Sequence, residues 1–245
     1  MLTTSHDHQA RVQIRPGFSW DRQDAYLFDI DGTLLRSLDR VHFDSFAFSI
    51  RQVTGREVPL AGVSIHGSTD TMILRDACRQ AGLTAEQLEP HLEKILETMR
   101  QTVVAGREGM ELLLMPCVKE MLRYLTEKGA RLGVASGNLE TIGWIKVEEA
   151  GLREWFDFGG FSDRFPVRQE LIGDAARQAR LLAGSQATVC VVGDTPRDIQ
   201  AAHANALPVI AVATGHYNFD ALLEHAPEVC ASSLADLLAP TQAVL

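Results

Sequence analysis

The sequence has only four cysteines, and they form neither a CxxC pair nor a cluster with histidine. Cys78, Cys117, Cys190 and Cys230 lie far apart, each in an apolar or helix-like stretch. This spacing gives no sign of a disulfide framework, and we interpret all four as reduced thiols of the core. Cysteine usage therefore predicts a cytoplasmic protein.

Long apolar runs and an excess of positive charge are also missing. Nowhere do 18 apolar residues follow one another, and the N-terminus has no apolar run of signal-peptide type, so nothing targets the chain to a membrane. The formal net charge of -9 argues against broad binding to nucleic acid or to an anionic membrane surface. An anionic substrate would need a local basic pocket. The oligomeric state cannot be read from the sequence.

The chain of 245 residues, 46% of them hydrophobic, can bury a full core. Residues 1–20 are polar and interrupted by Pro16-Gly17, so we interpret them as an N-terminal tail without assigned function. His6 and His8 in this tail are interpreted as polar filler and not as a metal site.

Apolar runs and helical patterns alternate in residues 21–36 and 112–245. We expect strands at 25–28, 132–135, 158–161, 188–192 and 209–212. Helices are expected after Pro116, at 142–149, at 169–182 and at 196–204. Such alternation predicts an α/β fold, a doubly wound parallel sheet with helices on both faces, whose ligands bind at the carboxyl ends of the strands.

Residues 37–111 differ from the rest because they show helical spacing and no strand-like run. Apolar residues recur at helix spacing up to Gly55, a second helix runs from Ser68 or Thr69 to Gly82, and a third starts at Thr84, which forms a capping box with Gln87. This segment is predicted to be a helical domain inserted after the first strand of the α/β core.

The strongest chemical signal is the run from Asp29 to Leu34, which reads DIDGTL and follows an apolar strand. Five specified residues would coincide by chance in about one in a few thousand chains. An acidic turn that merely closes a strand is the simpler alternative. Two carboxylates in unlike environments, Asp29 and Asp31, can divide the work of nucleophile and of acid or base.

A second acidic run, GDTPRD from Gly193 to Asp198, follows the strand expected at 188–192. Thr195 and Pro196 are typical of a helix start, which places Asp194 in the turn and Asp198 in the first helical turn. Asp198 alone is explained by the helix dipole, but Asp194 at a second strand end is not. Carboxylates from two loops are what an octahedral magnesium site requires.

A third strand ends at Ser136-Gly137-Asn138. We expect this segment to bind substrate, with the Ser136 hydroxyl and the Gly137 amide directed at a phosphoryl oxygen. An ordinary strand-to-helix turn explains the same residues.

Together these motifs resemble the haloacid dehalogenase superfamily, whose pattern is DxDGT, a Ser or Thr, a basic residue and GDxxxD. The resemblance covers residues 25 to about 215 and implies a Rossmann-like core with a helical cap. It also implies the roles of the acidic residues: Asp29 as nucleophile, and Asp31 as the acid that protonates the leaving oxygen and then activates water.

The same resemblance implies that magnesium is held by the Asp29 carboxylate, the Asp31 carbonyl and Asp194, with Asp198 in support. Thr33 would orient Asp29, and Ser136 would bind the phosphoryl group.

The basic residue of the pattern departs from the family's lysine. The four lysines are Lys94, Lys119, Lys128 and Lys146, and none lies in the expected region. We therefore assign the role to Arg168, which directly precedes the helix expected at 169–182, with Arg164 as the alternative.

The expected activity is magnesium-dependent hydrolysis of a small phosphorylated metabolite, of the phosphoglycolate or sugar phosphate class. His42 stands where a resembling mutase, β-phosphoglucomutase, has an early cap histidine. The run from His66 to Asp70 resembles the cap loop of phosphoglycolate phosphatases, which makes Thr69 a candidate for binding substrate; an N-cap explains it equally well.

Three alternative functions can be compared with this expectation. A true dehalogenase is disfavoured, because dehalogenases lack the acid at the position of Asp31. A sugar-phosphate mutase and a non-catalytic phosphate-binding module on the same fold are left open.

Overall fold

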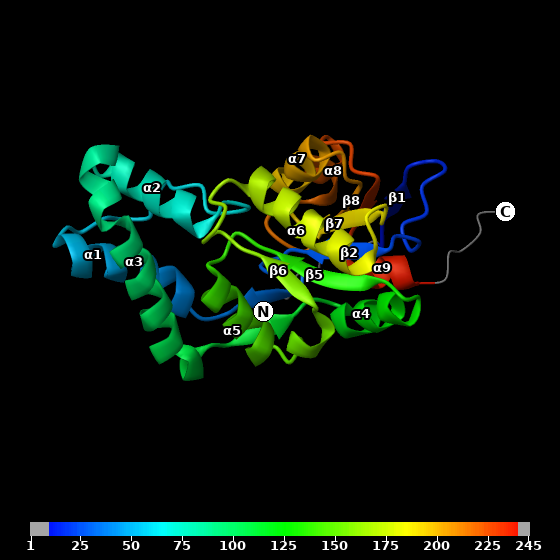
Figure 1. Ribbon diagram of the computed structural model, residues 1–245, viewed down its shortest axis with the longest axis horizontal. Coiled ribbons are helices and arrows are strands. Elements are labelled where there is room, and N and C mark those ends of the chain that lie inside the picture. Colours follow the sequence, from blue (N-terminus) through cyan, green and yellow to red (C-terminus); the bar gives the residue numbers. More distant parts are fainter. Residues whose placement is uncertain (1–9, 240–245) are drawn as a thin grey trace, which may run out of the picture.

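Three of the apolar runs that precede polar motifs lie side by side in one sheet. The computed structural model describes residues 10–239 and shows an α/β core with a helical unit at one end (Figure 1). The sheet has the order β1-β9-β8-β7-β2-β5-β6 and is parallel except for β1, which pairs antiparallel with β9. Its strands are β1 (Val12–Ile14), β2 (Ala25–Phe28), β5 (Arg131–Ala135), β6 (Phe158–Gly160), β7 (Val189–Gly193), β8 (Val209–Val212) and β9 (Val229–Ala231).

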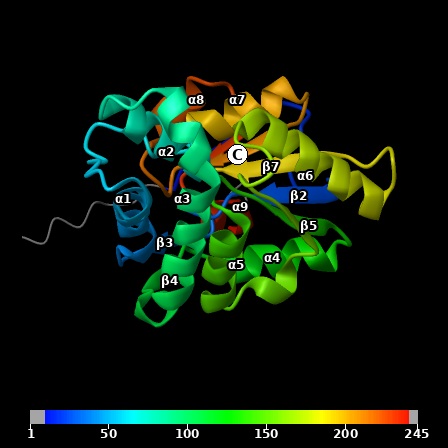
Figure 2. The same ribbon diagram turned by 60° about the vertical axis from the view of Figure 1, so that its left-hand side comes forward.

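Helices cover both faces of the sheet, as Figures 1 and 2 show. One face is covered by α4 (Val118–Glu127), α5 (Glu140–Glu149) and α9 (Leu234–Leu238), and the other by α6 (Arg168–Ala183), α7 (Pro196–Ala204) and α8 (Phe219–Leu223). The central strand β2 contacts both layers of helices. Tyr26 and Phe28 pack against the first layer, and Ala25 and Leu27 pack against the second. A strand buried on both faces needs apolar residues at every position.

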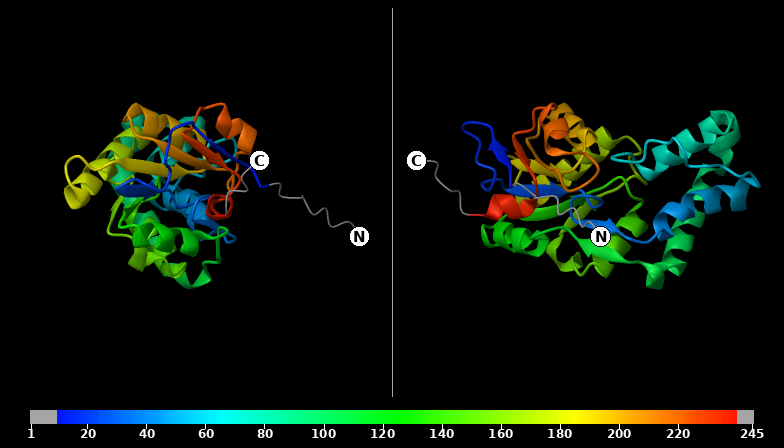
Figure 3. Two further views of the ribbon diagram at one scale, coloured as in Figure 1. Left: turned by 90° about the vertical axis from the view of Figure 1, so that its right-hand side faces the viewer. Right: turned by 180° about the vertical axis from the view of Figure 1, so that it is seen from behind.

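The helical unit, which we call the cap, consists of α1 (Val41–Thr54), α2 (Asp70–Gln80), α3 (Ala85–Ala105) and a short 3-10 helix η1 (Arg107–Gly109). It stands beyond the end of the core in the view from behind (Figure 3). Two chain segments join it to the core and pair as a two-stranded antiparallel sheet, β3 (Leu35–Ser37) with β4 (Leu112–Leu114). A second short 3-10 helix, η2 (Arg153–Trp155), lies in the core.

The apolar core of the cap continues onto a helix of the α/β core. Ile50, Leu74 and Met99 of the cap belong to the same buried cluster as Ile142 and Ile145 of α5. Cap and core are therefore joined by an apolar contact as well as by the two connecting segments.

The structure corrects the N-terminal prediction. The segment 1–20 was expected to be a tail, yet Val12–Ile14 forms strand β1 at the edge of the sheet, where Arg15 pairs with the buried Glu228. His6 and His8 lie outside the described residues. Val12, Gln13 and Ile14, with no periodicity to either side, gave no signal for this strand.

The cysteine prediction is wrong in one position, because Cys117 is exposed while the other three are buried. All four are free thiols. Among residues 10–239, no helix has the length and apolar character needed to cross a membrane.

Candidate active site

The three polar motifs meet at the carboxyl edge of the sheet. Strand β2 pairs in parallel with β5 on one side and with β7 on the other. Asp29, Ser136 and Asp194 each directly follow one of these strands, so the register brings them to one place. All three side chains are buried.

Asp29, Asp194 and Asp198 offer carboxylate oxygens that lie within 4.8 Å of one another. Burial raises the pKa of Asp29 to about 6, with Arg168 opposing the shift and Asp198 and Asp31 adding to it. Burial, together with the charges of Asp29 and Asp198, also holds the pKa of Asp194 well above its usual value. Clustered carboxylates that resist ionisation suit a divalent cation, whose charge would relieve the repulsion.

Arg168 is buried at the start of α6, between two of these carboxylates. Its Nη2 lies 3.1 Å from Asp29 Oδ1 and 2.5 Å from Asp198 Oδ1. Arg164, the alternative, instead places its guanidinium over the ring of Phe165. The choice of Arg168 over Arg164 as the basic residue beside Asp29 therefore agrees with the geometry.

Asp198 has its carboxylate engaged on both oxygens. Oδ1 accepts from Arg168, and Oδ2 accepts from the backbone amide and hydroxyl of Thr195, which closes a capping box at the start of α7. The side chain thus anchors Arg168 and the loop that carries Asp194.

Thr33 contacts a different carboxylate from the one expected. Its hydroxyl donates to Asp194 Oδ1 at 3.1 Å, whereas the family resemblance implied that it orients Asp29. Gly32 lies beside it with a φ of +88°, and a Cβ there would lie 2.3 Å from Asp194 Oδ2. Glycine is therefore required for the turn and for the close approach of the two acidic loops.

The carboxylate of Asp31 is bound by the ammonium group of Lys146 and the side-chain amide of Asn138, and not by the other acidic residues of the site. Lys146 Nζ donates to both carboxylate oxygens, at 2.8 and 2.7 Å, and Asn138 Nδ2 donates to Oδ2 at 2.8 Å. Burial opposes ionisation of Asp31, but Lys146 and Asn138 outweigh it and keep the pKa below its usual value. Asn138 also donates to the Ser136 hydroxyl oxygen at 2.8 Å.

Asp70 links the cap to the core on the opposite side of the pocket. One of its oxygens accepts from the backbone amide of Leu139 at 2.8 Å and lies 3.1 Å from His42 Nε2. Its own amide donates to the Gly137 carbonyl oxygen at 2.7 Å. His42 therefore lines the pocket with its ring beside a buried cap carboxylate, and substrate binding by His42 stays a prediction.

Thr69 does not line the pocket. Its hydroxyl donates to the Pro166 carbonyl oxygen at 2.5 Å and accepts the Met72 amide as the N-cap of α2. These contacts support the capping alternative, and substrate binding by Thr69 stays a prediction. Its neighbours Ser68 and Asp70 do line the pocket.

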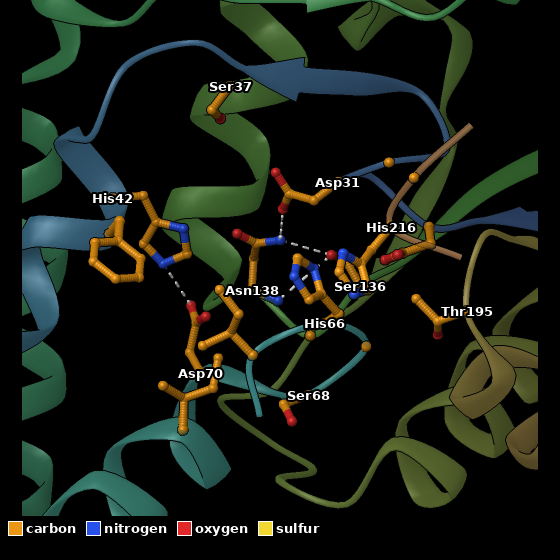
Figure 4. Close-up of a pocket in the computed structure, with 18 of the residues that line it drawn as sticks. Asp31, Ser37, His42, His66, Ser68, Asp70, Ser136, Asn138, Thr195 and His216 are labelled. Atoms are coloured by element: carbon orange, nitrogen blue, oxygen red, sulfur yellow. Dashed lines mark hydrogen bonds and ion pairs between the residues drawn. The ribbon is translucent and has the colours of Figure 1, made fainter. Parts of the chain in front are cut away.

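A pocket of about 590 Å³ opens between cap and core above these groups (Figure 4). The core contributes Asp29, Asp31, Asp194 and Ser136, while the cap contributes Asp70 and the apolar Phe43, Phe46 and Ile73. His66 of the cap and His216 of the core stack across the boundary with ring centroids 4.1 Å apart. Both lie beside Ser136 in the close-up view.

Residues 23–205 match a known family, described as haloacid dehalogenase-like hydrolase. The chain belongs to this family. The resemblance seen in the motifs is thereby confirmed, as are the predicted α/β fold and the expectation of a hydrolase of this family.

Relatives match this haloacid dehalogenase-like hydrolase over most of their length. "Probable phosphatase IndB" of Dickeya dadantii is 26% identical over 224 residues, which cover 89% of this chain and 94% of that protein. A phosphoglycolate phosphatase of Synechococcus elongatus is 26% identical over 220 residues, covering 87% and 95%. A predicted phosphatase from Clostridium acetobutylicum has the same fold, with a TM-score of 0.64, 20% identity and coverage of 84% and 92%.

The contact of Lys146 with Asp31 was not predicted, because the sequence pattern placed the basic residue of the site in the loop before α6. A signal was present. Lys146 lies four residues after Ile142 and next to Val147, so a charged residue occupies an otherwise apolar stretch of α5. A lysine in such a place needs a buried partner. Asp70 was noted in the cap loop but not as a link to His42.

Proposed function

We propose that this hydrolase is a magnesium-dependent phosphatase that acts on a small phosphorylated metabolite through a phosphoaspartate on Asp29. One observation carries the proposal: the guanidinium of Arg168 contacts the buried carboxylate of Asp29, which clusters with the carboxylates of Asp194 and Asp198 beneath a pocket that the cap covers. The pocket volume of about 590 Å³ suits a small molecule. The named phosphatases among the relatives support the same class of reaction.

Magnesium would be held by Asp29 and Asp194, with the Asp31 carbonyl as the third protein ligand expected from the family. Asp198, engaged by Arg168 and Thr195, would support the site from close by. The metal would supply positive charge against the phosphoryl oxygens. Hard carboxylate oxygens are the donors that magnesium prefers.

The first step is attack of an Asp29 oxygen on phosphorus while the bond from phosphorus to the leaving oxygen breaks. Arg168 and the Ser136 hydroxyl stabilise the phosphoryl oxygens, and Asp31 gives a proton to the leaving oxygen. Asp31 is ionised in the free protein, so it must first take up a proton. The negative phosphoryl group arriving beside it favours that uptake.

The second step is hydrolysis of the phosphoaspartate. A water molecule attacks phosphorus and gives a proton to Asp31, while the bond from phosphorus to Asp29 breaks and inorganic phosphate leaves. Lys146 and Asn138 keep the pKa of Asp31 below its usual value against the effect of burial, so the carboxylate is in the ionised form that can take this proton. The cap excludes bulk water from the phosphoaspartate while it forms.

The proposal is tested by measuring phosphate release from an aryl phosphate and from a panel of phosphorylated metabolites. We expect release that chelator abolishes and magnesium restores. Undiminished turnover in excess chelator would contradict the metal assignment. A mutase would instead return the phosphoryl group to a sugar and release little phosphate, and a binding module would release none.

A cytoplasmic location is proposed on the cysteines alone, since all four are free thiols.

A further inference from the structure

A buried lysine on α5 contacts Asp31 but has so far been considered only for its effect on the pKa of that residue. The side chain of Lys146 is 3% exposed, and its Nζ donates to both oxygens of Asp31 and to Asn138 Oδ1 at 2.9 Å. An ammonium group has three protons to donate, and these three contacts use them. Burying a charged ammonium group costs desolvation free energy, so the reason for retaining Lys146 must lie in the groups that it contacts.

The partner that reaches the pocket is Asp31. Its side chain is 43% exposed, whereas the lysine that holds it is buried. Oδ1 is held by Lys146, and Oδ2 by Lys146 and Asn138 together. The three donated bonds fix the orientation of a carboxylate that neighbouring side chains would otherwise leave free to rotate.

The helix that carries Lys146 is shared by cap and core. Ile142 and Ile145 pack into the apolar cluster of the cap, while Val147 packs into the cluster under the sheet. On the core side, a Cβ at Gly143 would lie 2.5 Å from the ring of Phe161, so α5 lies close against the loop after β6. Lys146 therefore projects from a helix whose position is fixed from both sides.

We propose that Lys146 is a positioning residue, which holds Asp31 in the orientation needed to protonate the leaving oxygen of the substrate. This inference rests on the proposed phosphatase function. Arg168 already lies beside Asp29, and the hydrogen bonds of Lys146 go to Asp31 and Asn138, so the two cations contact different carboxylates.

The experiment uses the dependence of rate on the leaving group. The ratio kcat/KM reports steps up to departure of the leaving group, and that departure needs Asp31 for an alkoxide but little for nitrophenolate. Lys146→Met keeps an unbranched side chain of similar length. It should lower kcat/KM about 30- to 100-fold for the best alkyl phosphate of the panel and less than about threefold for nitrophenyl phosphate, as expected for a misplaced acid.

Two further variants make the test specific. Lys146→Arg keeps a cation with several donors and should recover most of the loss on the alkyl phosphate. Lys119→Met, on the exposed face of α4, is the matched control and should behave as wild type. Thermal unfolding of each variant shows whether the fold persists.

The outcomes separate the inference from the proposed function. Failure of the wild-type protein to release phosphate from any substrate would contradict the proposed function itself. An active wild type with an equal loss on both substrates in Lys146→Met would overturn the positioning role and indicate direct contact with the phosphoryl group. No loss on either substrate would overturn it as well.

Discussion

Arg168 bridges two buried carboxylates, and its planar fork fits that position better than the point charge of a lysine. Arg168→Ala should lower turnover about a hundredfold or more, because a charged donor to the transition state is lost. Arg168→Lys keeps the positive charge but lacks the planar guanidinium, so its turnover should lie between those of the wild type and of Arg168→Ala. Arg164→Ala, the matched control, should stay near wild type, since its side chain contacts the Phe165 ring.

These activities are measured on folded protein, because removing Arg168 leaves Asp29 and Asp198 without their counter-charge. A loss of about 3–5 kcal/mol in unfolding free energy is expected for Arg168→Ala. Full activity in Arg168→Ala with loss in Arg164→Ala would move the role to Arg164.

Asp29 gives the metal-free protein an unusual dependence of stability on pH. Its pKa is raised from 3.8 to about 6 in the folded state, so the folded protein binds a proton that the unfolded chain releases. The corresponding stability is fully present below about pH 4 and is lost as pH rises through about 6. Asp29→Asn should flatten this fall, and saturating magnesium should reverse it.

The measurement is urea unfolding at a series of pH values, in chelator and in magnesium. Asp24 provides the matched control, because its pKa is lowered by contacts with Thr188 at the far end of β2. Asp24→Asn should leave the slope between pH 4 and 6 in place. Equal slopes in wild type and Asp29→Asn would contradict the assignment.

At this scale the sequence predicted the residues that follow strands. Asp29, Asp194 and Ser136 could be found because an apolar strand precedes each motif and parallel strands end at one edge. Contacts between segments that are distant in the sequence could not be predicted. The bond from Thr33 to Asp194 and the ion pair of Lys146 with Asp31 depend on the packing of β7 and α5 against β2, which no local pattern specifies.

Among the elements, the pair β3–β4 joins the cap to the core, and we expect the cap to move about this connection. Other contacts hold the cap against the core. Arg100 of α3 donates to Asp163 of the core at 2.7 Å, and Arg197 of α7 donates to Ser68 and Ser64 of the cap loop. These are among the polar contacts between cap and core that opening would break, together with those of Asp70 and Thr69.

Arg100→Ala should favour the open cap and lower kcat/KM about two- to fivefold, in keeping with the modest free energy of a partly exposed ion pair. Arg51→Ala is the matched control, because Arg51 pairs with Glu57 inside the cap and crosses no boundary. Scattering in solution reports the cap angle. An unchanged angle in Arg100→Ala, with unchanged kinetics, would show that this contact does not hold the cap.

Element boundaries followed the sequence where caps and glycines mark them. The capping box of Thr84 begins α3, and α7 and β8 have the bounds expected from the sequence. Strand β1 was missed because an edge strand of three exposed residues carries no apolar pattern. Its place in the sheet is set by pairing with β9 and not by its own composition.

For the whole molecule, charge is distributed unevenly. The net charge is -9, yet the pocket brings together Arg36, Arg40, Lys146 and Arg168. The same lining holds Asp29, Asp31, Asp39, Asp70 and Asp194, so the pocket is not basic overall, and an anionic substrate would depend on these cations and on a bound metal. Two of these cations face acidic residues of the site, which reduces the positive charge left for the substrate.

The central claim is that Asp29 carries the phosphoryl group during turnover, and acid-quenched protein from a reaction with magnesium and substrate tests it most directly. Mass spectrometry of proteolytic fragments should find one phosphoryl group, on the fragment that contains Asp29 and at that residue. Asp29→Asn, which keeps the shape of the side chain, should fold, carry no phosphoryl group and release no phosphate. A phosphoryl group on another residue, or phosphate release by folded Asp29→Asn at the wild-type rate, would contradict the account.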